Sequence, residues 1–132
     1  MANHYFIYLG RENGKRTIHK VGQTTRTCYA RCKSADYKIG CAFEIEFKEN
    51  LTDEVKKSLL NCVETIILGE FRSVYKIAHG REYFRTTKQN WDVVKPFFVE
   101  KMESFLNGNR NVFKNMIAGY TYYEGWVAPN TY

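Results

Sequence analysis

The chain has 132 residues, of which 44 % are hydrophobic and 16 % aromatic, with only two prolines. This size and composition indicate one folded domain and exclude both a disordered chain and two separate cores. Twenty Lys and Arg against fourteen Asp and Glu give a formal net charge of +6, which favours a polyanionic partner such as nucleic acid.

The N-terminal segment predicts a β-hairpin. Residues 4–10 are rich in strand-forming side chains. Asn13-Gly14 follows, and this dipeptide is the strongest short signal for a tight hairpin turn. Residues 17–22 then have the composition of a returning strand, so the chain is expected to open with two antiparallel strands.

A short helix and a further strand are predicted next. Thr25 or Thr27 can cap a helix that runs to about Ala35. Residues 41–48 then alternate, with four apolar side chains on one face and charged ones on the other. The apolar set is Cys41, Phe43, Ile45 and Phe47. Such alternation predicts a half-buried strand.

Two longer helices are predicted in the second half of the chain. Residues 52–75 begin with an acidic turn and continue with apolar side chains at helical spacing. Residues 81–86 form a short strand or extended segment. Thr87 can cap a second helix over residues 88–106, and Pro96 is expected to kink or divide it.

The last residues differ from the rest in character. Residues 1–108 are predicted to form the domain, and residues 109–132 an aromatic and basic extension. The extension contains Arg110, Lys114, Tyr120, Tyr122, Tyr123, Trp126 and Tyr132. Such side chains can stack on nucleic-acid bases. The favoured interpretation is that the extension packs on the domain or on a neighbouring subunit.

Compartment and cysteine usage follow from what the sequence lacks. No window approaches the roughly 20 apolar residues of a membrane span, and no signal peptide is recognisable, so an intracellular, cytoplasmic protein is expected. Cys28 and Cys32 have the i, i+4 spacing of a zinc-binding pair. No second close pair exists, so these two cysteines, together with Cys41 and Cys62, are predicted to be free thiols.

Several short motifs follow one another along residues 4–86. In chain order they are Phe6-Ile7-Tyr8, Lys20-Val21-Gly22, Arg31, Glu64, Phe71 and Gly80-Arg81-Glu82-Tyr83-Phe84. Together they resemble the GIY-YIG nuclease superfamily, most closely its phage-type branch, in which the second tripeptide is Lys-Ile/Val-Gly. Each motif alone is common, and the order and spacing carry the resemblance. Phe6 replaces the usual glycine and Lys20 the usual tyrosine.

The resemblance implies a fold and a function. The fold is α+β, with a small three-stranded antiparallel sheet made of the N-terminal hairpin and one more strand, flanked by helices. The function is that of a Mg²⁺-dependent endonuclease that hydrolyses phosphodiester bonds in DNA, with Mn²⁺ as a substitute metal. RNA is the other substrate to consider, and a phage or mobile element is the expected source. Because a lone catalytic domain has one site, a double-strand cut needs either a homodimer, which is predicted, or successive nicks.

Glu64 and Arg31 are the strongest candidates for catalysis. Glu64 lies at the edge of the apolar helix stripe and is the expected metal ligand, because Mg²⁺ is often held by only one or two carboxylates. Glu70 is the next candidate. Arg31 can present its planar guanidinium to two phosphate oxygens. Arg26 competes with it, but Arg31 follows Gly22 by nine residues, which matches the family spacing.

Tyr8 and Lys20 complete the predicted catalytic set. If both alternate onto one sheet face, either can take the proton from the attacking water. Tyr8 is favoured as the general base, with Lys20 as its activator or as a phosphate clamp. The missing second tyrosine leaves a different class of function open, namely a catalytically inactive nucleic-acid-binding module of the same fold. A third hypothesis is an interaction domain with a chance likeness.

Other residues are predicted to contact the nucleic acid through hydroxyl, amide, cationic or backbone groups. They are Gly22, Gln23, Thr24, Arg26, Lys38, His79 and Arg81. Of these, His79 is equally interpretable as an exposed loop histidine.

Overall fold

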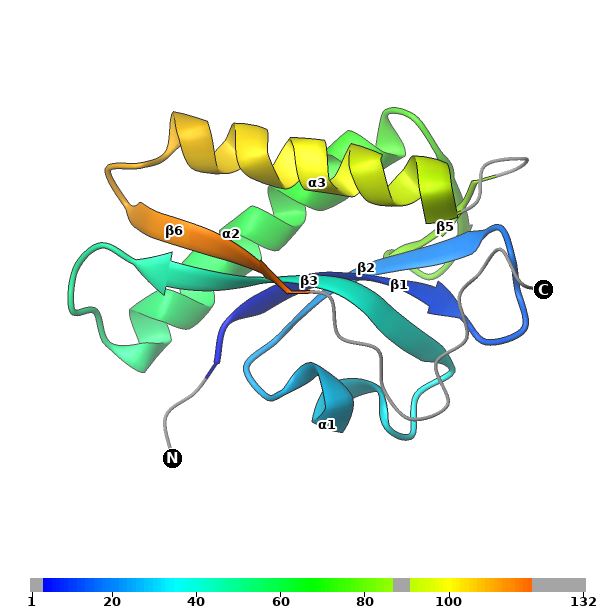
Figure 1. The fold of residues 1–132 in the computed structure, drawn as a ribbon, viewed down its shortest axis with the longest axis horizontal. Helices are drawn as coiled ribbons and strands as arrows, with labels where there is room; N and C mark the ends of the chain where they lie inside the picture. The colour runs from blue at the N-terminus through cyan, green and yellow to red at the C-terminus, as the bar shows by residue number, and fades with distance from the viewer. Residues whose placement is uncertain (1–3, 87–90, 120–132) are drawn as a thin grey trace.

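The computed structural model describes residues 4–86 and 91–119. These residues form one antiparallel sheet in the order β4-β5-β2-β1-β3-β6, which curls into a half-barrel (Figure 1). The strands are β1 (Phe6–Glu12), β2 (Ile18–Thr24), β3 (Tyr37–Phe47), β4 (Lys76–His79), β5 (Tyr83–Arg85) and β6 (Phe113–Gly119). The helices are α1 (Cys28–Cys32), α2 (Asp53–Arg72) and α3 (Trp91–Gly108).

The prediction of a small three-stranded sheet is wrong. The N-terminal hairpin and β3 lie together at the centre, but β5 and β4 extend the sheet beyond β2, and β6 extends it beyond β3. The added strands give little sequence signal, because β4 and β5 have only four and three residues. Strand β6 falls within the segment interpreted as an extension, and residues 120–132 lie outside the described part of the chain.

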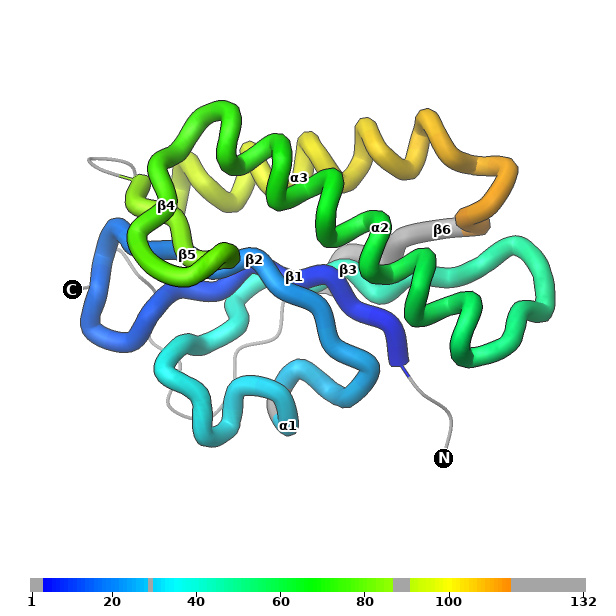
Figure 2. Tube along the Cα trace, turned by 180° about the vertical axis from the view of Figure 1, so that it is seen from behind, coloured from blue at the N-terminus to red at the C-terminus, as the bar shows by residue number. Residues whose placement is uncertain are grey.

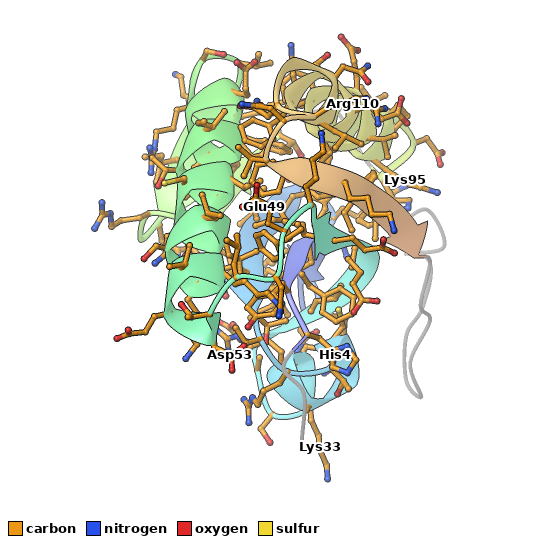
Figure 3. The ribbon with its side chains drawn as sticks, turned by 90° about the vertical axis from the view of Figure 1, so that its left-hand side faces the viewer. His4, Lys33, Glu49, Asp53, Lys95 and Arg110 are labelled. Carbon is orange, nitrogen blue, oxygen red and sulfur yellow. The ribbon has the colours of Figure 1, made fainter. Side chains whose placement is uncertain are left out.

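The sheet separates two cores. Helices α2 and α3 cover one face and α1 covers the other, as the views from behind and from the side make clear (Figures 2 and 3). Phe71 lies at the centre of the larger core, where its ring contacts four other aromatic rings. These belong to Tyr75, Phe84, Phe97 and Phe98. The smaller core contains Tyr8, Cys28, Cys32, Tyr37, Ile39 and Ala42.

Helix α1 is short and capped. The Thr27 hydroxyl accepts a hydrogen bond from the Ala30 backbone N–H at 3.2 Å, so Thr27 rather than Thr25 is the N-cap. The helix ends at Cys32, three residues before the predicted end near Ala35. The prediction of free thiols is confirmed for the four cysteines, of which only Cys62 is exposed.

The two longer helices support the larger core. In α2 the Thr52 hydroxyl accepts a hydrogen bond from Val55 N–H at 3.3 Å. Pro96 was predicted to kink or divide the following helix. Helix α3 runs unbroken through Pro96, so of these two alternatives the division is wrong. Pro96 is exposed and lies in the second turn, where its missing N–H removes one hydrogen bond while the buried face stays in place. The predicted cap at Thr87 lies outside the described residues. None of the described helices combines the length and hydropathy needed to cross a membrane.

His19 is buried in the larger core and makes fold stability depend on pH. Its Nδ1 lies 3.0 Å from the Thr86 hydroxyl, and its ring stacks on Trp91. Burial, reinforced by Arg11, lowers the pKa of His19 to about 3 from its ordinary 6.5. The folded protein therefore favours the neutral ring, and protonation of His19 in acid lowers the free energy of unfolding.

We expect the free energy of unfolding to be at its full value above pH 6.5 and to decline as the pH falls toward 3. The His19 contribution to that loss is at most about 2 kcal/mol at pH 5. Urea denaturation between pH 7.5 and pH 5, with His19→Gln as the comparison, measures it. The glutamine variant should show the flatter profile over this range. Equal slopes for both proteins would show that His19 titrates normally.

Candidate active site

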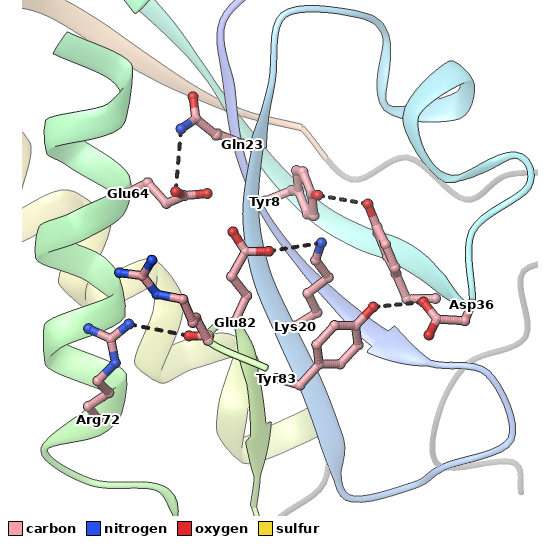
Figure 4. Close-up of polar contacts among 10 residues, drawn as sticks. Tyr8, Lys20, Gln23, Asp36, Glu64, Arg72, Glu82 and Tyr83 are labelled. Carbon is pink, nitrogen blue, oxygen red and sulfur yellow. Dashed lines mark hydrogen bonds and ion pairs between the residues drawn. The ribbon is translucent and has the colours of Figure 1, made fainter. Parts of the chain in front are cut away.

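The candidate site lies at the point along β2 where its pairing with β5 ends. Strand β5 pairs with residues 18–20 of β2. Among the described residues, one backbone bond, from Val21 N–H to the Glu82 carbonyl, extends this pairing toward the C-terminal end of β2. Beyond that point α2 lies beside β2 in place of a strand (Figure 4). Side chains from both faces of the sheet can therefore meet at this edge.

The structure brings the four predicted catalytic residues to this edge from four different elements. Tyr8 on β1 and Lys20 on β2 share a sheet face, and the Lys20 amine lies 5.8 Å from the centre of the Tyr8 ring. Arg31 on α1 interacts electrostatically with Tyr8 and with Glu64 on α2. Lys20 also acts on the Glu64 carboxylate.

Tyr37 on β3 connects three of these residues, although no sequence motif pointed to it. Its hydroxyl lies 2.8 Å from the Tyr8 hydroxyl, and the two rings stack. The Lys20 amine lies 4.3 Å from the centre of the Tyr37 ring, and the Arg31 guanidinium 5.9 Å from it. Tyr37 thus fixes the positions of a phenol and two cations at once.

Glu82 is a second residue that the sequence interpretation left out of the site. Its Oε2 lies 3.2 Å from the Lys20 amine, which is almost fully buried (Figure 4). Glu82 also raises the pKa of Glu64. The available signal was its place in the Gly80-Arg81-Glu82-Tyr83-Phe84 motif.

Glu64 has one oxygen held and one oxygen available. Its Oε1 accepts a hydrogen bond from the Gln23 amide at 3.3 Å, and the same amide group also contacts Asn61. Its Oε2 is buried and has no hydrogen-bond partner among the described residues. Burial and then Glu82 raise the pKa of Glu64, against the opposing effects of Gln23, Lys20 and Arg31.

This carboxylate fits a divalent cation. A buried oxygen without a partner is costly, and a metal ion would satisfy it. The described residues contain no group of three or more side chains that could hold a metal. A cation at Glu64 would therefore keep most of its positions for water and phosphate, which suits Mg²⁺ better than a structural zinc ion.

Tyr8 is protonated near neutral pH. Burial is the main cause that raises its pKa, the hydrogen bond with Tyr37 adds to it, and Arg31 opposes the shift. The ring is fully buried between its neighbours and packs directly against Gly22, where a Cβ atom would lie 2.4 Å from the Tyr8 hydroxyl. In this state Tyr8 donates or accepts hydrogen bonds more readily than it loses its proton.

Two pockets flank the Gln23–Glu64 contact. The first has a volume of about 450 Å³ and contains the carboxylates and two arginines. It is lined by Glu64, Thr65, Leu68, Arg72, His79, Gly80, Arg81, Glu82 and Tyr83. The second has a volume of about 370 Å³ and a cationic lining. It is lined by Gln23, Thr24, Thr25, Arg26, Arg31, Lys57 and Asn61.

The predicted nucleic-acid contacts divide between these pockets, with two exceptions. Gln23, Thr24 and Arg26 line the second pocket, and His79 and Arg81 line the first. Gly22 lies under the Tyr8 ring. Lys38 lines neither pocket, because its amine donates to the Cys32 carbonyl at the end of α1 at 3.3 Å.

The side chain of His79 contacts two other residues. It lies 2.6 Å from Glu12, and its ring stacks on that of Tyr83 with the centroids 4.1 Å apart.

The chain matches no known family model, and no curated protein or solved structure matches it. The function is therefore inferred from the chemistry of the site and from the sequence motifs.

Proposed function

We propose that this protein is a divalent-metal-dependent endonuclease of the GIY-YIG type that hydrolyses phosphodiester bonds in DNA. One observation carries the proposal. The partnerless, buried oxygen of Glu64 lies at the same strand edge as Arg31, Lys20 and Tyr8, which come from three other elements. Such a combination of one metal-binding carboxylate with a phenol and two cations suits an anionic phosphate that requires a metal.

Phosphodiester hydrolysis makes three demands on such a site. The attacking water must lose a proton, charge on the pentavalent phosphorus group must be balanced, and the departing oxygen must be stabilised. Glu64 would hold Mg²⁺, or Mn²⁺ in its place, and the ion would supply Lewis-acid stabilisation of phosphate charge. Arg31 would donate from its fork to two phosphate oxygens.

The remaining roles are shaped by the contacts of Tyr8 and Lys20. Lys20, fixed by Glu82 and the Tyr37 ring, acts as a phosphate clamp. Tyr8 keeps its proton near neutral pH, so we assign it to orienting the attacking water rather than to removing its proton unaided. Glu82 acts electrostatically on both Tyr8 and Glu64, and we assign to its carboxylate the role of accepting that proton.

A second candidate is a nucleic-acid-binding module without catalysis. Two contacts favour it: the Tyr8 hydroxyl is hydrogen-bonded to the Tyr37 hydroxyl, and the Lys20 amine is paired with Glu82. Both sequence-predicted bases are therefore engaged. The module would bind DNA or RNA in a salt-dependent way and leave it intact.

Supercoiled plasmid separates the two candidates. The protein is incubated with Mg²⁺, Mn²⁺ or EDTA, and nicking and gel-shift are measured on the same samples. Nicking that needs the metal and stops with EDTA supports the endonuclease. Binding that weakens with salt and is never followed by cleavage supports the module. The absence of both binding and cleavage rejects both candidates.

Arg31→Lys is expected to slow cleavage by about 10- to 100-fold, and Arg31→Ala by roughly 10²- to 10³-fold. Lysine keeps the charge but lacks the planar fork that holds two phosphate oxygens. The measurement is the single-turnover cleavage rate at saturating DNA, with Arg16→Ala in the exposed hairpin turn as the control. If Arg31→Lys cleaves as fast as the wild type, Arg31 does not hold two phosphate oxygens at once in the reaction.

The proposed place of action is the cytoplasm, or that of the host cell if a phage or mobile element encodes the protein. One chain has one site and cuts one strand, so a double-strand break requires a homodimer or two successive nicks. The aromatic side chains proposed as a subunit contact, residues 120–132, lie outside the described residues.

A further inference from the structure

One face of helix α2 lines both pockets. Lys57 and Asn61 line the second pocket, and Glu64, Leu68 and Arg72 line the first. These positions are three or four residues apart and therefore form a single stripe along the helix. The stripe begins and ends with a cation and carries the candidate metal ligand in its middle.

The cations at the two ends are not neutralised. Within the described residues, no carboxylate forms an ion pair with Lys57, Arg26 or Arg31 in the second pocket. The same holds for Arg72 and Arg81 in the first. The Arg72 guanidinium instead donates to the Arg81 carbonyl at 3.3 Å (Figure 4), and both residues line the first pocket.

We infer that one nucleic-acid strand lies along α2, with Lys57 and Arg72 binding backbone phosphates on opposite sides of the phosphate at Glu64. The inference rests on the proposed function and adds the path of the substrate strand to it. Lys57, with Arg26, holds one flank, and Arg72, with Arg81, holds the other.

The dimensions favour a strand over a small anion. Fifteen residues separate Lys57 from Arg72, which corresponds to about 22 Å along the helix axis. One strand of duplex DNA rises 3.4 Å per nucleotide, so this length corresponds to about six nucleotides. A single phosphate or a small phosphorylated metabolite would occupy one pocket and leave the other without a role.

The carboxylates in the middle also point to this arrangement. Glu64 and Glu82 would repel a phosphate placed between the two cationic ends. A cation at Glu64 reverses that repulsion, whereas the two flanking pockets attract phosphates with or without metal. Binding in EDTA should therefore depend on the flanks, and cleavage on the centre.

The test is fluorescence anisotropy with a labelled 20-base-pair DNA duplex in EDTA at four salt concentrations. Lys57→Ala and Arg72→Ala should each reduce the slope of log affinity against log salt by about 1, and the double variant by about 2. Lys114→Ala is the charge-matched control, because Lys114 is exposed on β6 at the opposite edge of the sheet. Its slope should equal that of the wild type.

Each failure has its own signature. If the wild type binds and cleaves DNA but the slopes of both α2 variants match that of Lys114→Ala, the strand lies elsewhere and the proposed function stands. If only one variant changes the slope, the strand does not span both pockets and the inference is overturned. If the wild type neither binds nor cleaves, the proposed function itself fails.

Discussion

Replacing Glu64 with glutamine should slow metal-dependent DNA cleavage by roughly 10³-fold and leave the protein folded. Glutamine has the same size, and its side-chain oxygen can still accept the hydrogen bond from the Gln23 amide. It lacks the negative charge that would hold the metal. Burial and Glu82 raise the pKa of Glu64, which means that its ionised form is disfavoured in the folded state. The melting temperature of Glu64→Gln should therefore equal or exceed that of the wild type.

Glu70→Gln is the matched control. Glu70 is the other glutamate considered as a metal ligand, but its carboxylate pairs with Lys101 at 3.3 Å. We expect this variant to cleave at the wild-type rate. The readout is the single-turnover rate over a titration of Mg²⁺ and Mn²⁺. If Glu70→Gln slows cleavage as much as Glu64→Gln does, the assignment of the metal to Glu64 is wrong.

Gly22→Ala should destabilise the protein by about 1–3 kcal/mol and disturb the site from within the sheet. The added methyl would lie 2.4 Å from the Tyr8 hydroxyl and 2.5 Å from its ring carbon Cζ. Tyr8 is fully buried and cannot swing into solvent. Its ring must move to relieve the clash, and this movement would disturb the 2.8 Å contact between the Tyr8 and Tyr37 hydroxyls.

Urea denaturation of five proteins measures this effect, namely the wild type, Gly22→Ala, Tyr8→Leu, their double variant and a control. Gly69→Ala is the control, because Gly69 lies exposed in α2 with no atom within 4 Å of an added Cβ, and alanine there should stabilise the helix by up to about 1 kcal/mol. Gly22→Ala combined with Tyr8→Leu should cost less than the sum of the two single changes. Strict additivity would mean that the methyl and the phenol do not collide.

The sequence was most informative where function depends on local spacing. Alternation along the hairpin places Tyr8 and Lys20 on one sheet face, and the observed register, with Tyr8 opposite Gly22 and Gly10 opposite Lys20, has this result. The position of Glu64 at the edge of the α2 stripe was likewise readable, because helical periodicity separates its side from the buried Val63 and Ile67.

The sequence was least informative where long-range pairing builds the site. Glu82 reaches Lys20 because β5 pairs with β2, and Tyr37 reaches Tyr8 because β3 pairs with β1. Neither pairing leaves a local pattern around those residues. Strand β4 is mostly exposed and only four residues long, so its side chains show no alternation, and the extent of the sheet was underestimated.

Lys38 illustrates the limit of charge alone. Its place in a basic chain suggested a phosphate contact, yet its amine donates to the carbonyl that ends α1. A lysine and the carbonyls at a helix C-terminus attract each other through the helix dipole, and nothing in the composition distinguishes that use from a phosphate contact.

The most direct test measures binding and cleavage together for the wild type and Glu64→Gln. Labelled DNA is saturated with each protein in EDTA, Mg²⁺ is added, and the product is followed in one turnover. The wild type should cleave the bound DNA, and Glu64→Gln should bind with at least equal affinity but leave it intact. Bound DNA that the wild type leaves intact with both Mg²⁺ and Mn²⁺, or cleavage by Glu64→Gln at the wild-type rate, would contradict a metal-dependent nuclease centred on Glu64.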